Sequence, residues 1–179
     1  MNKFCIDLDL GVPLFKPNID PMLFPTTYHM ALDNTTISNE LKDLLWEHKM
    51  YPAFFEYFYK SEFHTGNIHS DTDKLGDWPK LNWVFGGEDS TMSWYMLKDG
   101  AVPIINNTNA NTYSLHFNSE DLILAHTQHQ GTPSLIQSGI PHSAKTLTKV
   151  RRCFSLCVHR DKQRPTWDDM ISAFSKYIK

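Results

Sequence analysis

The sequence predicts a mainly β fold, in which short strands form a barrel or a sandwich and a few helices pack around it. Alternating or aromatic-rich stretches recur at fairly even intervals, with Gly, Pro, Asn and Asp between them, as in closed or stacked antiparallel sheets. Of the 179 residues, 41% are hydrophobic and 13% are aromatic. This length and composition suit one substantial core, so we expect residues 1–179 to form a single domain.

The first part of the chain, residues 1–53, is expected to be an extended and partly helical segment. Prolines recur near its start and exclude long helices there. They are Pro13, Pro17, Pro21 and Pro25. Residues 35–50 instead predict a helix, because leucines fall at helical spacing and Thr36 or Ser38 could cap the first turn.

Residues 54–160 are expected to form the β core. The predicted strands cover residues 54–63, 81–85, 91–97, 112–117, 121–127, 134–142 and 150–159. The pair Gly86-Gly87 marks a turn between two of them. The C-terminal segment, residues 161–179, predicts a helix that starts near Pro165 or Thr166, because acidic residues occupy its first turn and a lysine its last.

Charge and cysteine content narrow the functional class. The formal net charge is −3 and no long basic stretch is present, so nothing indicates a non-specific nucleic-acid binder, although a nucleobase stays open as a substrate. The odd, scattered set Cys5, Cys153 and Cys157 argues against a disulfide framework. The N-terminus does not resemble a secretory signal, and no apolar run approaches the ~20 residues of a membrane span. We expect a soluble, cytoplasmic protein without a membrane partner.

A His-x-Asp tripeptide, His69-Ser70-Asp71, is the first candidate metal-binding feature. On an extended strand, residues two apart point to the same side, so an imidazole nitrogen and a carboxylate oxygen can meet on one cation. Two histidines and one carboxylate suit non-haem Fe(II) and leave positions open. His142, which follows a predicted strand and a proline, could supply the missing ligand. The alternative is a polar turn at Ser70 and Asp71.

Arg151 lies nine residues beyond this histidine, on the predicted strand 150–159. A guanidinium on a core-like strand is costly unless it meets an anion, and its planar fork matches a carboxylate. Arg151 shares a strand face with Ser155 and with small cysteines, which leave room for a bound molecule, whereas Arg152 shares its face with bulky side chains. We favour Arg151 as the anion-binding residue, with Ser155 as a hydrogen-bond donor. A β-bulge would reverse the choice.

Together, His69-x-Asp71, His142 and Arg151 resemble the Fe(II)- and 2-oxoglutarate-dependent oxygenases, and residues 54–160 look most like the small oxygenase-like proteins of marine phages and bacteria. The resemblance implies a double-stranded β-helix, a jelly-roll or cupin-like barrel. It implies Fe(II) on the two histidines and the aspartate, O2 as oxidant, and 2-oxoglutarate held at its far carboxylate by Arg151. The implied reaction is hydroxylation or demethylation at a C–H bond, with 2-oxoglutarate converted to succinate and CO2.

Other functions use the same features differently. A non-catalytic jelly-roll module that binds a ligand or a protein would keep the histidines and the aspartate in structural roles. A cupin-type metalloenzyme without a cosubstrate would leave the arginine unexplained. The substrate stays open among small molecules, protein side chains, nucleobases and lipids, and we expect residues 98–112 and the proline-rich N-terminus to select it.

The remaining polar candidates carry weaker signals. His126 and His129 would bind a metal on a helix, yet their segment predicts a strand end and an exposed loop. The other candidates are His64 and His116 for packing or a substrate pocket, and Tyr57 or Tyr59 for a cosubstrate contact.

Overall fold

The computed structural model describes residues 2–72, 74–107, 113–130 and 133–179. The strands are β1 (Cys5–Asp7), β2 (His29–Leu32), β3 (Met50–Lys60), β4 (His69–Ser70), β5 (Pro79–Gly86), β6 (Thr91–Leu97), β7 (Ile104–Asn107), β8 (Tyr113–His116), β9 (Leu122–His129), β10 (Ser134–Gln137), β11 (His142–Lys145) and β12 (Arg151–Arg160). The α-helices are α1 (Asn39–Glu47) and α2 (Trp167–Phe174). Short 3-10 helices are η1 (Pro21–Leu23), η2 (Asn34–Thr36), η3 (Ser119–Asp121) and η4 (Ser175–Tyr177).

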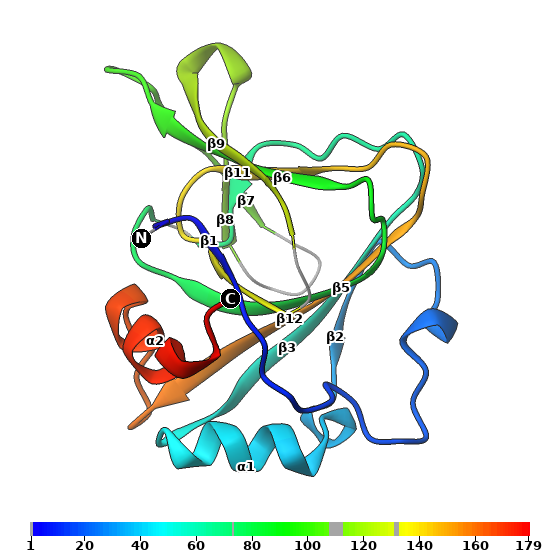
Figure 1. Ribbon diagram of the computed structural model, residues 1–179. Helices are drawn as coiled ribbons and strands as arrows, with labels where there is room; N and C mark the ends of the chain where they lie inside the picture. Colours follow the sequence, from blue (N-terminus) through cyan, green and yellow to red (C-terminus); the bar gives the residue numbers. More distant parts are fainter. Residues whose placement is uncertain (1, 73, 108–112, 131–132) are drawn as a thin grey trace.

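The strands form two antiparallel sheets of six strands each (Figure 1). The first has the order β1-β10-β5-β12-β3-β2, and the second has the order β7-β8-β4-β11-β6-β9. The chain alternates between the sheets from β3 to β6 and again from β9 to β12. This winding is the double-stranded β-helix, so the predicted mainly β jelly-roll fold is confirmed.

The main hydrophobic core lies on the outer face of the first sheet. Alternate side chains of its strands, among them Tyr57, Leu81 and Phe154, pack there against the N-terminal segment, α1 and α2. Figure 1 shows both helices on this side of the molecule. Fully burying one such side chain contributes roughly 1.5–3 kcal/mol, so this layer anchors the first sheet from outside the barrel.

The inner face of the same strands is polar. Because side chains alternate along a strand, the residues between the core positions face the second sheet. The buried polar residues of this face are Glu56 and Lys60 on β3, Lys80 and Asn82 on β5, and Arg151 and Ser155 on β12. A buried polar layer between two sheets needs internal partners or a bound ligand.

Local signals explain both α-helices and their lengths. Ser38 caps α1 by accepting a hydrogen bond from the Leu41 amide, and Lys49 reverses the chain with a φ of 58°, so the predicted helix 35–50 is shorter than expected. Thr166 and Asp169 form a capping box at α2. The helix ends at Phe174 and continues as η4, short of residue 179.

The predicted strand 134–142 is confirmed only for Ser134–Gln137, which form β10, because a turn separates them from β11. A Cβ on Gly139 would lie 2.2 Å from the Gly76 carbonyl oxygen, so only glycine fits this crossing. The sequence patterns also missed β1, β2 and β7. Residue 112 of the predicted strand 112–117 lies outside the described residues.

Two further expectations concern the cysteines and the membrane. Cys5, Cys153 and Cys157 are free thiols and all are buried, so the expected absence of a disulfide framework agrees with the structure. Within the described part of the chain, no helix combines the length and the apolar character needed to cross a membrane.

We predict that Phe154→Ala lowers the free energy of unfolding by about 3–5 kcal/mol. The Phe154 ring is fully buried, with ring centroids of Phe15, Phe24 and Tyr57 4.8–4.9 Å away. Urea unfolding measures the loss. Phe63→Ala is the control, because Phe63 is 76% exposed; equal losses in the two variants would contradict the placement of the core.

Candidate metal centre

Two neighbouring strands of the second sheet bring the predicted histidines together. His69 on β4 lies directly opposite His142 on β11, so both side chains leave the same face of the sheet. Their ring centroids are 4.6 Å apart. Asp71 follows β4, and its amide donates to the Ser138 carbonyl at 3.0 Å, which fixes the start of its loop.

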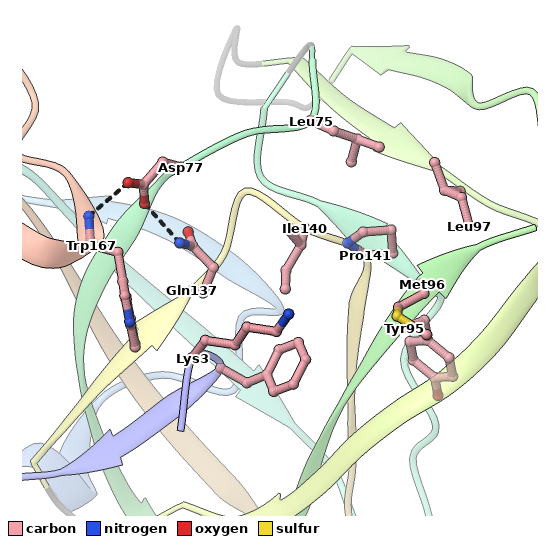
Figure 2. A pocket seen from close by; sticks show the side chains of 11 residues that line it. Lys3, Leu75, Asp77, Tyr95, Met96, Leu97, Gln137, Ile140, Pro141 and Trp167 are labelled. Atoms are coloured by element: carbon pink, nitrogen blue, oxygen red, sulfur yellow. Dashed lines mark hydrogen bonds between the residues drawn. The ribbon is translucent and has the colours of Figure 1, made fainter. Parts of the chain in front are cut away.

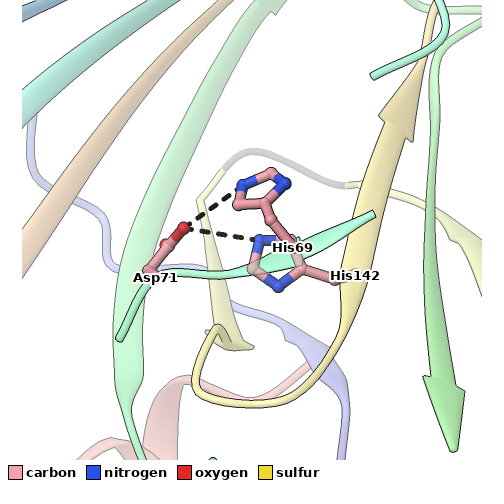
Figure 3. A group of neighbouring side chains, drawn as sticks. All are labelled: His69, Asp71 and His142. Atoms are coloured by element: carbon pink, nitrogen blue, oxygen red, sulfur yellow. Dashed lines mark ion pairs between the residues drawn. The ribbon is translucent and has the colours of Figure 1, made fainter. Parts of the chain in front are cut away.

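The three side chains converge on a small volume (Figure 3). Asp71 Oδ1 lies 3.3 Å from His69 Nε2 and 3.7 Å from His142 Nε2, and one ligand atom from each residue lies within 4.8 Å of the others. Two ligands that each lie ~2.1 Å from one transition-metal ion can be at most ~4.2 Å apart. The distances from Asp71 Oδ1 to the two histidine Nε2 atoms are within this limit. The three side chains could therefore hold one cation.

Backbone carbonyls fix the tautomers of both histidines. His69 Nδ1 lies 2.9 Å from the Asn67 carbonyl oxygen, and His142 Nδ1 lies 2.9 Å from the Ile140 carbonyl oxygen. A carbonyl only accepts, so each Nδ1 carries a proton and each Nε2 is directed at Asp71. The Nε2 lone pair of a neutral His142 then faces the Asp71 carboxylate, and a cation would relieve that conflict.

The ionisation states suit a metal as well. Burial lowers the pKa of His142 to about 4, and the nearby Asp71 opposes this only in part. Burial also opposes ionisation of Asp71, yet Lys80 and His142 outweigh it and hold the pKa of that carboxyl well below its usual range. At neutral pH the group therefore offers a neutral His142 and an ionised Asp71.

A buried lysine supports the carboxylate from the first sheet. Lys80 Nζ lies 2.9 Å from Asp71 Oδ2 and 2.8 Å from Glu56 Oε2, and His29 Nε2 lies 2.9 Å from the second oxygen of Glu56. Lys80 engages one Asp71 oxygen and leaves the other for the histidines. The sequence analysis did not identify Lys80 and Glu56. A charged residue on a core-like strand, the signal that indicated Arg151, could have indicated both.

Arg151 and Arg152 lie on opposite faces of β12. Arg151 is 3% exposed, faces the second sheet and donates from Nη2 to Gln130 Oε1. Arg152 instead lies over the ring of Tyr59, 5.5 Å from its centroid. The irregularity in β12 falls between Cys157 and Val158, beyond the arginines, so it does not exchange their faces.

Ser155 lies on the inner face, directly opposite Asn82 on β5 and Glu56 on β3. Asn82 Oδ1 is buried and has no hydrogen-bond partner among the described residues. An unsatisfied buried oxygen beside a buried hydroxyl is a place where a polar ligand or an ordered water fits.

The weaker candidates fall outside the group. His116 lies opposite His69 with ring centroids 5.9 Å apart, but it is not a member of the ligand cluster. His126 and His129 belong to β9, so the expectation of an exposed loop there is wrong. The tyrosines also lie away from the group: Tyr57 donates its hydroxyl to the Pro25 carbonyl and Tyr59 packs against the outer core.

A separate pocket of about 420 Å³ opens next to the turn that precedes His142 (Figure 2). Ile140 and Pro141 line it together with Phe4 and Leu97, and none of the three ligand residues does. The pocket therefore lies beside the support of His142 and is distinct from the ligand group.

Comparisons with known proteins concern the fold alone. No protein-family model matches the chain, and no curated protein matches it. Among solved structures, AviO1 from Streptomyces viridochromogenes Tue57 is similar, with 14% identity and a TM-score of 0.44 over 84% of this chain and 73% of that chain. HygX from Streptomyces hygroscopicus with nickel and 2-oxoglutarate bound has 10% identity and a TM-score of 0.41, over 77% of this chain and 71% of the HygX chain. A cupin 2 domain-containing protein from Halorhodospira halophila has 10% identity and a TM-score of 0.30, over 82% of this chain and 75% of the cupin chain. The expected likeness to proteins of marine phages and bacteria stays a prediction.

We predict that the metal-free protein loses stability between pH 6.5 and pH 4. The pKa of His142 is about 4 when folded and 6.5 in its ordinary state, so the unfolded chain takes up the proton first as pH falls. The contribution of His142 to the free energy of unfolding should drop by up to about 3 kcal/mol through this window and stay constant above it. The lowered pKa of Asp71 adds a loss of the same sign at lower pH.

Urea unfolding between pH 7 and pH 4 measures this dependence. In His142→Asn the slope above pH 4 should shrink, because the titrating imidazole is gone. A slope that the substitution leaves unchanged would show that another group causes the acid sensitivity.

Proposed function

We propose that this protein is an Fe(II)- and 2-oxoglutarate-dependent dioxygenase that oxidises a C–H bond of its substrate. One observation carries the proposal: the Nε2 atoms of His69 and His142 converge on one oxygen of Asp71. Two histidines and one carboxylate, with open positions beside them, are the ligand set of non-haem Fe(II) oxygenases.

The buried arginine favours an oxygenase over a zinc hydrolase, which can use similar ligands. Arg151 is buried on the inner face, and it donates a hydrogen bond to the neutral side-chain amide of Gln130 rather than to a carboxylate. A cosubstrate that carries a free carboxylate would neutralise this guanidinium, with Ser155 as a second donor. A hydrolytic metal centre needs no carboxylate-bearing cosubstrate for its reaction.

Each side chain would then have a defined task. His69, Asp71 and His142 would hold Fe(II), and the carbonyls of Asn67 and Ile140 would keep both imidazoles in the ligating tautomer. When bound, Fe(II), 2-oxoglutarate and O2 would supply the oxidation of the substrate, with succinate and CO2 as the other products.

Lys80 would hold Asp71 as a ligand through one oxygen only, because its ammonium engages the other oxygen at 2.9 Å. The polar inner face would surround 2-oxoglutarate, whose far carboxylate would lie on Arg151. The substrate would enter beside these groups. Residues 98–112 stay candidates for its selection, although residues 108–112 lie outside the described part of the chain.

We predict that the protein binds Mn(II) and, with Fe(II), 2-oxoglutarate and air, forms succinate. Asp71→Ala should weaken metal binding by more than about tenfold and lose succinate formation with it, because the carboxylate is the charged ligand. Isothermal titration calorimetry measures the affinity for the metal, and mass spectrometry measures the amount of succinate formed. Asp43→Ala, which changes an exposed aspartate of α1, is the matched control. Full metal affinity in Asp71→Ala would refute the site and leave a non-catalytic jelly-roll module as the better interpretation.

We predict that Arg151→Met keeps metal affinity and weakens 2-oxoglutarate binding by roughly 30-fold or more. Removing one partner of a buried charge pair costs about 2–5 kcal/mol, while the metal ligands stay in place. Titration of 2-oxoglutarate into the Mn(II)-loaded variants measures the effect. Arg152→Met should bind 2-oxoglutarate normally; the reverse result would show that the other face of β12 holds the cosubstrate.

A further inference from the structure

Arg151 has a second buried cation beside it. Lys60 on β3 lies directly opposite Arg151 on β12, and the two residues are 7% and 3% exposed. Among residues 2–72, 74–107, 113–130 and 133–179, the ion pairs with Asp and Glu involve neither of them. Two like charges buried side by side require an anion that the described part of the chain does not supply.

The electrostatic cost is visible on Lys60. Burial, and then the nearby Arg151, lower the pKa of Lys60 to about 8. The lysine of the metal loop shows the opposite behaviour, since Asp71 and Glu56 overcome the effect of burial and raise the pKa of Lys80 well above its usual range. The charge of Lys80 is balanced by carboxylates of the protein, and within the described residues the charge of Lys60 is not.

The two cations are directed at different places. Arg151 donates to Gln130, just beyond β9, whereas Lys60 Nζ lies 3.2 Å from His64 Nε2 and next to Gly66, where an added Cβ would be 3.1 Å away. Gly66 bonds to β11 through its amide, and β6 separates β11 from β9. The two head groups therefore have different neighbours in the second sheet.

Lys60 lies near the proposed metal ligands. The Gly66 amide donates to the Ala144 carbonyl at 2.9 Å, and Ala144 follows His142 by two residues, which is ~6.6 Å along a strand. Gly66 itself precedes His69 by three residues. Gly66 is buried, and its backbone packs against the Lys60 ammonium on the side of the metal-bearing strands.

The other side of Lys60 faces an aromatic ring near the surface. Its Nζ lies 5.1 Å from the centroid of the Tyr28 ring, and Tyr28 is 59% exposed. A molecule that approaches from this side meets a flat aromatic surface first and the buried ammonium behind it. This combination fits a small anion with a flat or apolar body.

We propose that the substrate is such an anion and that Lys60 binds its carboxylate or phosphate while Arg151 binds 2-oxoglutarate. The inference rests on the proposed function, because the cosubstrate is what occupies Arg151. The two carboxylates of 2-oxoglutarate serve the metal and Arg151, so the charge of Lys60 is left for the substrate. Lys60 is thus a residue that determines specificity for an anionic group.

The test uses the full chain loaded with Mn(II) and saturated with 2-oxoglutarate. Benzoate and inorganic phosphate are the probes, and benzamide is the neutral counterpart of benzoate. We expect at least one of the two anions to bind in calorimetric titrations and benzamide not to bind. The stronger of the two then tells whether the site prefers a carboxylate or a phosphate.

The variants assign this binding to Lys60. Lys60→Met should weaken binding of the anion at least tenfold, whereas Lys60→Arg should retain this binding. Lys145→Met removes an exposed lysine of β11 and should leave the affinity for the anion unchanged. The inference is overturned if neither anion binds once 2-oxoglutarate is present. It is also overturned if Lys60→Met weakens the binding of 2-oxoglutarate instead of the binding of the probe. Failure of the proposed function is separate, because it appears beforehand as a lack of Mn(II) or 2-oxoglutarate binding.

Discussion

The bridge from Lys80 to Asp71 and Glu56 is the interaction on which the candidate site depends. It joins the loop after β4, in the second sheet, to β3 and β5 in the first, through contacts of 2.8–2.9 Å. A buried ion pair adds little net stability, because desolvation offsets most of the attraction, but it fixes geometry and is costly to break. Lys80 therefore orients Asp71 toward the histidines, and the outer hydrophobic core must supply the free energy that keeps this charged interior folded.

The division of the first sheet into two faces makes that arrangement work. On β12, Phe154 and Leu156 belong to the outer core while Arg151 and Ser155 face the second sheet. A slip of one residue would exchange the two sets and put the arginine into the core. The large outer cluster holds the register against that slip, since its aromatic rings interlock around Phe154. The apolar positions thus determine where the polar groups point.

This division explains how much the sequence could predict. His69, Asp71, His142 and Arg151 were predicted because each is costly or unusual in a strand context, and the alternation of β12 was sufficient to predict which of two arginines faces the second sheet. Lys80 was missed because it directly precedes the predicted strand 81–85, and Lys60 because the polar residues Ser61 and Glu62 follow it in the predicted strand 54–63, so that both charges look like surface residues. Their burial depends on which strands lie opposite, and one sequence does not contain that information. For the same reason β1 and β2 were missed, since they pair with strands far along the chain.

The same physics separates structural charges from functional ones in this interior. Lys80 has two carboxylates within 2.9 Å, so its charge is satisfied by the protein and it needs no ligand. Arg151 and Lys60 are buried as deeply but have neutral hydrogen-bond partners, an amide and an imidazole. A folded chain can carry such charges only at a cost to its stability, and binding an anion removes that cost. In the proposed function, the cost of burying these two cations would be recovered as affinity for anionic ligands.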